Sequence, residues 1–166
     1  MISTLTFTEQ KLIKPKIVDI IDECLTGDMK QTALDFVDYV TEMKMPPRWS
    51  NRNSWVVNFK GKGVCKITMW ENGWFIRPSA IDDSDDALIV FCVENKLEEV
   101  LWENIYHCRG CGKSPADCMQ KTKTVFGKEF KAVCSCVLFQ FHNPNSTAIE
   151  CVKKLMDFRR ADIAQC

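Results

Sequence analysis

The chain has 166 residues, of which 46% are hydrophobic and 27% are charged, and these fractions are typical of a folded globular protein. Its 22 basic and 22 acidic residues give a formal net charge of zero. A general nucleic-acid binder needs a surplus of cations to displace counterions, so the balance predicts no nucleic-acid partner, although it leaves room for a local basic patch.

The sequence contains no run of about 18 apolar residues, so we expect no transmembrane helix and no membrane partner. The N-terminal stretch MISTLTFTEQKLIKPK lacks an apolar core followed by a small-residue cleavage site, and it is not interpreted as a signal peptide. We therefore expect a cytoplasmic protein. In that compartment the ten cysteines are expected to be reduced thiols or metal ligands rather than disulfides.

Helical periodicity predicts two helices in the first 45 residues. The first lies within residues 14–28, with Pro15 in its first turn and Gly27 as its stop signal. The second covers residues 31–45 and ends at the following pair of prolines. Residues 1–29 are interpreted as an N-terminal helical arm, and residues 30–166 as a single α+β domain with a cysteine-rich loop at 107–118.

The hydrophobic period then changes from 3.6 to 2. Three short segments rich in β-branched and aromatic residues, at 54–59, 64–70 and 73–78, are separated by the turn-forming stretches KGKG and ENG. These segments predict an antiparallel meander. Trp74 and Phe75 are neighbours on a strand and should point to opposite faces, which favours a pocket or partner surface, or else a two-sided core completed by the N-terminal arm.

The remaining elements are predicted in a mixed order. The segment 87–93 fits either a buried strand or the start of a helix, and the strand is favoured. Residues 94–108 are interpreted as a helix, 128–142 as one long strand, and 143–163 as a closing helix. Thr147 and Glu150 have the spacing of a capping box in that last helix. The order predicts an α+β fold with a mainly antiparallel sheet, made of the meander plus later strands, and helices packed on one face.

The loop HCRGCGKSPADC raises the question of metal binding. Cys108 and Cys111 lie three residues apart, followed by a glycine that lets backbone N–H groups approach the thiolates, as in a zinc knuckle. Zinc takes four ligands, and Cys118 with either Cys134 or Cys136 would complete the set. The last two lie two apart on a predicted strand, so they are expected to share a face.

Two other interpretations of these cysteines stay open. In one, Cys134 and Cys136 are small buried hydrophobic residues and the loop thiols are free. In the other, the loop is a redox site, but its cysteine pair follows the C-terminal end of a predicted helix, where the helix dipole should raise the thiol pKa.

A ligand site is predicted around the stretch PPRWSNRNSW and the meander. Arg48, Trp49 and Arg52, together with Trp55 and Trp74, combine guanidinium groups with indole rings, and this combination suits an anion or a flat ring. The alternative is a loop that caps the sheet with Trp49 tucked beneath it.

The stretch MPPRWSNRNSWVVNFKGKGVCKITMWENGWFIRPS, in which a helix is followed by a proline-containing loop, a hairpin and a strand that ends near proline, resembles the core of small bacterial α+β domains of unknown function. Its layout is similar to frataxin-like domains over roughly residues 33–78, extended by the helix at 94–106. The C-terminal part departs from that layout and is similar to the tails of uncharacterised bacterial proteins. The resemblance implies no catalytic residues for this chain.

The sequence contains no GxSxG, P-loop, GxGxxG or HExxH motif, so it does not indicate an enzyme. The leading hypothesis is a non-enzymatic module that binds a small ligand or a protein partner and carries a structural zinc site. The second is a protein that binds or senses a soft metal through the cysteine-rich loop. The third is a small thiol-dependent enzyme.

Overall fold

The computed structural model describes residues 1–81, 84–107, 121–134 and 136–165. Within them the chain forms α-helices, a five-stranded antiparallel sheet and a two-stranded sheet, which confirms the predicted α+β class. Contacts divide the chain into two compact units, Met1–Ala80 with Phe141–Cys166 and Ile81–Gln140. No helix in the described part of the chain combines the length and apolar character needed to cross a membrane.

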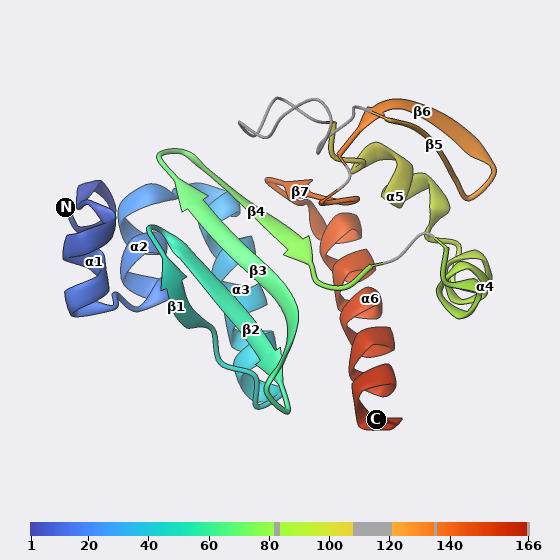
Figure 1. Cartoon of the computed structure of the whole chain (residues 1–166). Helices are drawn as coiled ribbons and strands as arrows, with labels where there is room; N and C mark the ends of the chain where they lie inside the picture. Colours follow the sequence, from blue (N-terminus) through green and yellow to red (C-terminus); the bar gives the residue numbers. More distant parts are fainter. Residues whose placement is uncertain (82–83, 108–120, 135, 166) are drawn as a thin grey trace. The chain divides into compact units, whose positions relative to one another are not determined.

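The first unit begins with a helical segment (Figure 1). Its elements are η1 (Ile2–Thr4), α1 (Phe7–Ile13), α2 (Ile17–Cys24) and α3 (Gly27–Glu42). The two predicted helices are confirmed as α2 and α3, although Gly27 begins α3 instead of only ending α2. The helix α1 was not predicted; it starts with a capping box in which Thr6 and Glu9 exchange hydrogen bonds.

The five-stranded sheet has the order β1-β2-β3-β4-β7. Its strands are β1 (Arg48–Asn51), β2 (Ser54–Phe59), β3 (Lys62–Trp70), β4 (Gly73–Pro78) and β7 (Phe141–His142). The predicted meander is confirmed as β2, β3 and β4, all antiparallel. The stretch predicted as a loop before the meander instead forms the edge strand β1, which pairs with β2.

One face of this sheet is buried. The register places Trp55, Ile67, Ile76 and Phe141 in one row across β2, β3, β4 and β7, and each of them is at most 1% exposed. Helices α2 and α6 (Ser146–Gln165) contact the sheet, and α3 reaches it where Phe36 approaches Trp74, 6.3 Å between ring centroids. The alternating side chains form a second, open face, on which Phe75 is half-buried.

The second unit contains α4 (Asp86–Glu94), α5 (Glu98–Glu103), β5 (Lys121–Val125) and β6 (Lys128–Val133). The strand predicted at 87–93 is wrong, because these residues form α4. Asp85 caps the helix by accepting hydrogen bonds from the N–H groups of Ala87 and Leu88, at 2.9 and 3.4 Å. Leu88 and Cys92, one turn apart, are its buried residues. In a short, wholly apolar run the hydrophobic period does not distinguish a strand from a helix, so the N-cap at Asp85 is the feature that favours the helix.

The long strand predicted at 128–142 is also wrong. β6 pairs with β5 through a turn at Phe126 and Gly127, both with positive φ, and it ends at Val133. The N–H of Cys134 then donates to the carbonyl oxygen of Tyr106 at 2.9 Å instead of continuing the ladder. The last two residues of the predicted strand belong to the other sheet as β7.

The two later helices differ from prediction at their starts. The helix predicted at 94–108 is reduced to α5, and it is separated from α4 by Lys96 in a left-handed conformation with φ 54°. In α6 the expected capping box is wrong, because Thr147 lies within the first turn. The cap is Asn145, whose Oδ1 accepts from the N–H of Ala148 at 2.9 Å.

A buried amide joins the N-terminal segment to the sheet. Gln10 of α1 is fully buried; its Nε2 donates to Asn53 Oδ1 at 2.6 Å and to the Ile2 carbonyl at 3.0 Å. Its Oε1 accepts from the Asn53 N–H at 2.8 Å. Asn53 sits in the turn between β1 and β2 with φ 48°, so Gln10 holds both this turn and the chain terminus.

Replacing Gln10 by alanine should leave the half-buried N–H and Oδ1 of Asn53 without this partner and lower the free energy of unfolding by about 1–3 kcal/mol. The matched control is Leu12→Ala in the same helix, where the side chain is 82% exposed and the loss should stay within about 0.5 kcal/mol. Urea denaturation of the full chain measures both. Equal losses in the two variants would contradict the role assigned to Gln10.

Candidate functional site

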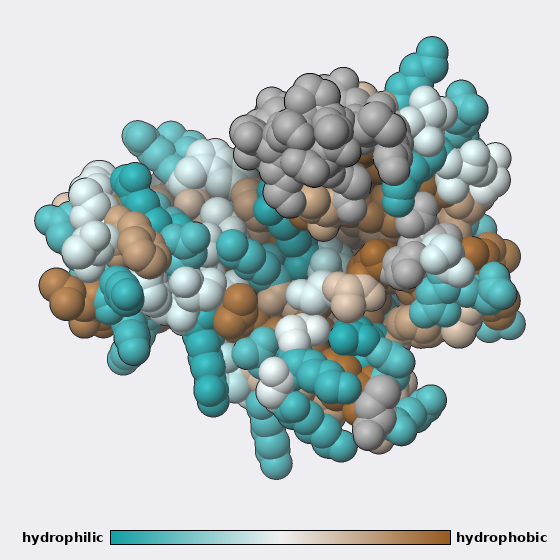
Figure 2. All heavy atoms as spheres, in the orientation of Figure 1, coloured by the Kyte–Doolittle hydropathy of each residue, from teal (hydrophilic) through white to brown (hydrophobic). Residues whose placement is uncertain are grey.

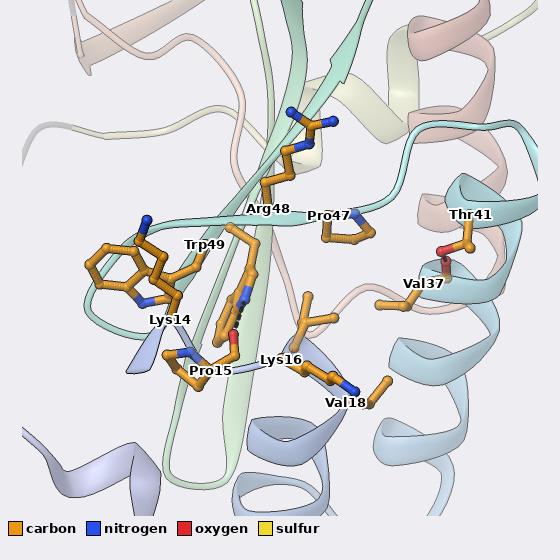
Figure 3. A pocket seen from close by; sticks show the side chains of 11 residues that line it. Lys14, Pro15, Lys16, Val18, Val37, Thr41, Pro47, Arg48 and Trp49 are labelled. Carbon is orange, nitrogen blue, oxygen red and sulfur yellow. Dashed lines mark hydrogen bonds between the residues drawn. The ribbon is translucent and has the colours of Figure 1, made fainter. Parts of the chain in front are cut away.

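A pocket of about 560 Å³ opens in the first unit where α2 begins (Figure 3). Segments from α2, α3 and the first two strands surround it. The lining residues are Lys14, Pro15, Lys16, Ile17 and Val18 at the start of α2, Val37 and Thr41 on α3, and Pro47, Arg48, Trp49 and Trp55 from β1, β2 and the chain before them. Its volume lies within the range of small-molecule sites.

Two tryptophans form the apolar wall on the sheet side. Trp55 points to the buried face of β2, and its indole N–H donates to the Pro15 carbonyl oxygen at 3.0 Å, which ties the sheet to the start of α2. Trp49 lies opposite Trp55 in the register, on the edge strand. Its ring stacks on Phe7 of α1 at 5.9 Å between centroids, and its N–H reaches Gln10 Oε1 at 3.4 Å.

The charged residues that line the pocket in the described part of the chain are all cationic. Lys14 ends α1 in a left-handed conformation, and Lys16 is the N-cap residue of α2 without a side-chain cap. In Figure 3 the Arg48 guanidinium extends away from Pro15. None of the described lining residues is an aspartate or glutamate. The N-terminal end of α2, which lies at this pocket, adds to the positive potential through the helix dipole.

The structure brings together three of the five residues predicted for the ligand site. Arg48, Trp49 and Trp55 line this pocket. Arg52 does not, because it is exposed and its Nη2 donates to the Thr4 carbonyl at 3.3 Å. Trp74 does not either, because it is fully buried in the core.

Sequence reasoning missed the wall contributed by the N-terminal helices. Lys14, Lys16, Val37 and Thr41 belong to segments that were assigned only to helices or to their ends. The available signal was the stretch KLIKPK, in which lysines flank a helix-starting proline. Nothing in its spacing indicated that it would lie beside Trp49.

The predicted metal ligands are only partly described. Cys108, Cys111 and Cys118 lie outside the described residues. Cys134 is buried and Cys136 is exposed, and both follow the end of β6, so the expectation that they share a strand face is wrong. Among the described residues, no group of three or more potential ligands lies together. The zinc site stays a prediction.

Four further cysteines are buried in the described part of the chain, namely Cys24, Cys65, Cys92 and Cys151. Burial raises the pKa of the Cys65 thiol, and burial, assisted by the charge of Glu98, raises the pKa of Cys92 to about 12. A raised pKa keeps a thiol protonated and unreactive, so these side chains act as small hydrophobic residues.

Comparisons with protein families, with curated proteins and with solved structures find no match to this chain. The frataxin-like resemblance therefore stays a prediction.

Cysteine alkylation should separate these thiols. In native protein purified without chelator, iodoacetamide should modify the exposed Cys136 and leave Cys65 and Cys92 unmodified, even as the pH rises from neutral to mildly alkaline, because pKa values raised this far leave almost no thiolate. Peptide mass spectrometry gives the extent of labelling at each position.

Rapid labelling of Cys92 at neutral pH would contradict its burial. Protection of Cys136 that only a chelator removes would support the predicted zinc site, whereas immediate labelling would exclude Cys136 from the ligand set.

Proposed function

We propose that this chain is a non-enzymatic binding module for a small ligand that combines a flat apolar group with an anionic group. The observation that supports it is the pocket at the start of α2, which Trp49 and Trp55 line together with Lys14 and Lys16. The apolar wall would receive the flat part of the ligand. The ammonium groups would receive its charge.

Shape and charge favour the same class of ligand. Tryptophan faces bind planar groups, and the prolines and aliphatic residues of the lining extend that apolar surface. With cations at the pocket and no carboxylate among its described lining residues, an anion is favoured over a cation or a neutral molecule. Lysine is a compact point charge, so either a carboxylate or a phosphate would be accepted.

The lining also favours binding over catalysis. The described lining residues include no histidine, cysteine or carboxylate, which are the groups that most often serve as nucleophile or general acid and base. The hydroxyl of Thr41 donates to the Val37 carbonyl at 2.7 Å within α3. The chemistry that remains is recognition by stacking, apolar contact and charge.

Naphthoate and its neutral counterpart naphthylmethanol test the proposal as a matched pair of probes. Titration calorimetry on the full chain should show that naphthoate binds more tightly, and that added salt reduces the difference. Replacing Lys14 or Lys16 by glutamine should weaken naphthoate binding by about 1.5- to 5-fold each, the range of an exposed ion pair. The same changes should leave naphthylmethanol binding unaltered.

Lys11→Gln is the control, since this lysine lies on α1 and does not line the pocket. Val37→Trp should fill the pocket and abolish binding of both probes. If neither probe binds, or if both bind equally and Val37→Trp has no effect, the pocket is not the ligand site.

A further inference from the structure

The charged residues of the five-stranded sheet differ in sign from most of those in α2 and α3. Every charged residue in the described strands of the five-stranded sheet is cationic: Arg48, Lys62, Lys66 and Arg77. The helices α2 and α3 carry the acidic residues Asp19, Asp22, Glu23, Asp28, Asp35, Asp38 and Glu42. A chain of zero net charge therefore contains a sheet that is locally basic.

Three of these cations form a row across the open face. Arg48 pairs with Val56, Val56 with Lys66, and Lys66 with Arg77, so the row crosses β1, β2, β3 and β4. At the usual spacing of neighbouring strands it spans roughly 14 Å. Partial burial and the adjacent Arg77 guanidinium lower the pKa of Lys66 from its usual value, so a bound anion would relieve an existing repulsion.

Aromatic rings lie beside this row on the same face. Phe75, two residues from Arg77 along β4, contacts Trp70 and His142 with ring centroids at 5.7 and 5.5 Å, and Trp70 lies 5.8 Å from His142. The Arg77 guanidinium lies 4.7 Å from the centre of the Phe75 ring. Two residues along a strand correspond to about 6.7 Å, so this compact cluster of three rings lies beside the row of cations.

The ring of Trp70 packs against the backbone of the neighbouring strand. It covers Gly73, its partner in the β3–β4 register, so closely that a Cβ at that position would lie 2.3 Å from the indole Cε2 atom. The side chain of Trp70 is nevertheless 37% exposed. Figure 2 shows hydrophilic and hydrophobic side chains intermixed over the strands that face the viewer in Figure 1.

We propose that the open face of the five-stranded sheet binds single-stranded nucleic acid, with the row Arg48–Lys66–Arg77 along the phosphates and the rings of Trp70 and Phe75 stacked on bases. A single strand needs both features, a track of positive charge and flat rings beside it. A duplex presents phosphates but no free base faces. An acidic peptide would use the cations and leave the rings without partners.

The experiment is fluorescence anisotropy of labelled oligonucleotides of about 16 nucleotides, as DNA and as RNA, titrated with the full chain at low salt. We expect the logarithm of the association constant to fall linearly with the logarithm of the salt concentration. The slope should be about −2, the value for three phosphate contacts on a single strand. Lys66→Glu should flatten this slope. Trp70→Ala and Phe75→Leu should each weaken binding at least about fivefold.

The controls match each change elsewhere on the same unit. Lys154→Glu alters an exposed lysine of α6 by the same charge, and Leu12→Ala removes an exposed apolar side chain of α1, so neither should affect oligonucleotide binding. Circular dichroism confirms that every variant is folded. Comparing the DNA oligonucleotide with the RNA oligonucleotide shows whether deoxyribose or ribose is preferred.

Three outcomes would overturn the proposal: no binding to either oligonucleotide, binding to duplex of the same length as strong as to single strand, or equal competition by polyaspartate together with insensitivity to the ring variants. The last would indicate an acidic protein partner. Two cross-checks keep this test separate from that of the pocket. The Lys66→Glu variant should still bind naphthoate, and the Lys16→Gln variant should still bind the oligonucleotide.

Discussion

The register of β2, β3 and β4 is the constraint on which the first unit depends. It places Trp55, Ile67 and Ile76 on one face and Lys66, Phe75 and Arg77 on the other. Because side chains alternate along a strand, a slip of one residue would exchange these two sets. It would expose apolar groups whose burial contributes roughly 1.5–3 kcal/mol each, and it would bury cations, so only one register is stable.

The helices are attached to that buried face through polar as well as apolar contacts. Trp55 fills the core, yet its indole N–H is satisfied by the Pro15 carbonyl at the point where α2 begins. Gln10 is likewise buried and hydrogen-bonded, to Asn53 in the turn between β1 and β2. These hydrogen bonds hold the N-terminal segment against the sheet, and the pocket opens where Pro15 meets Trp55.

The two proposed activities use the two faces of one sheet. The pocket is built at the edge of the buried face, where Trp49 and Trp55 meet the lysines before α2, and the open face combines cations with Trp70 and Phe75. Both depend on an uneven distribution of charge that the net charge of zero conceals. Arg48 stands at the shared edge, bordering the pocket and beginning the cationic row.

Several features could be predicted from the sequence because they depend on local pattern. Periodicity alone located α2, α3, α6 and the meander, and it placed Trp74 and Phe75 on opposite faces, since side-chain direction follows directly from position along a strand or helix. It failed at the apolar run that became α4 and at the run that divides between β6 and β7. In those runs the hydrophobic period does not distinguish helix from strand, and the structure depends on a helix cap or on the partner strand.

The candidate site shows the same division. The sequence by itself determined that Arg48, Trp49 and Trp55 lie close together in the chain at the start of the sheet. Only the tertiary structure decided that Lys14 and Lys16 lie beside them, and that Arg48 shares a row with Lys66 and Arg77. Such juxtapositions arise from strand pairing and from helices docking over long separations in the chain. No local pattern records them, because the free energy that selects them comes from burial shared by the whole unit.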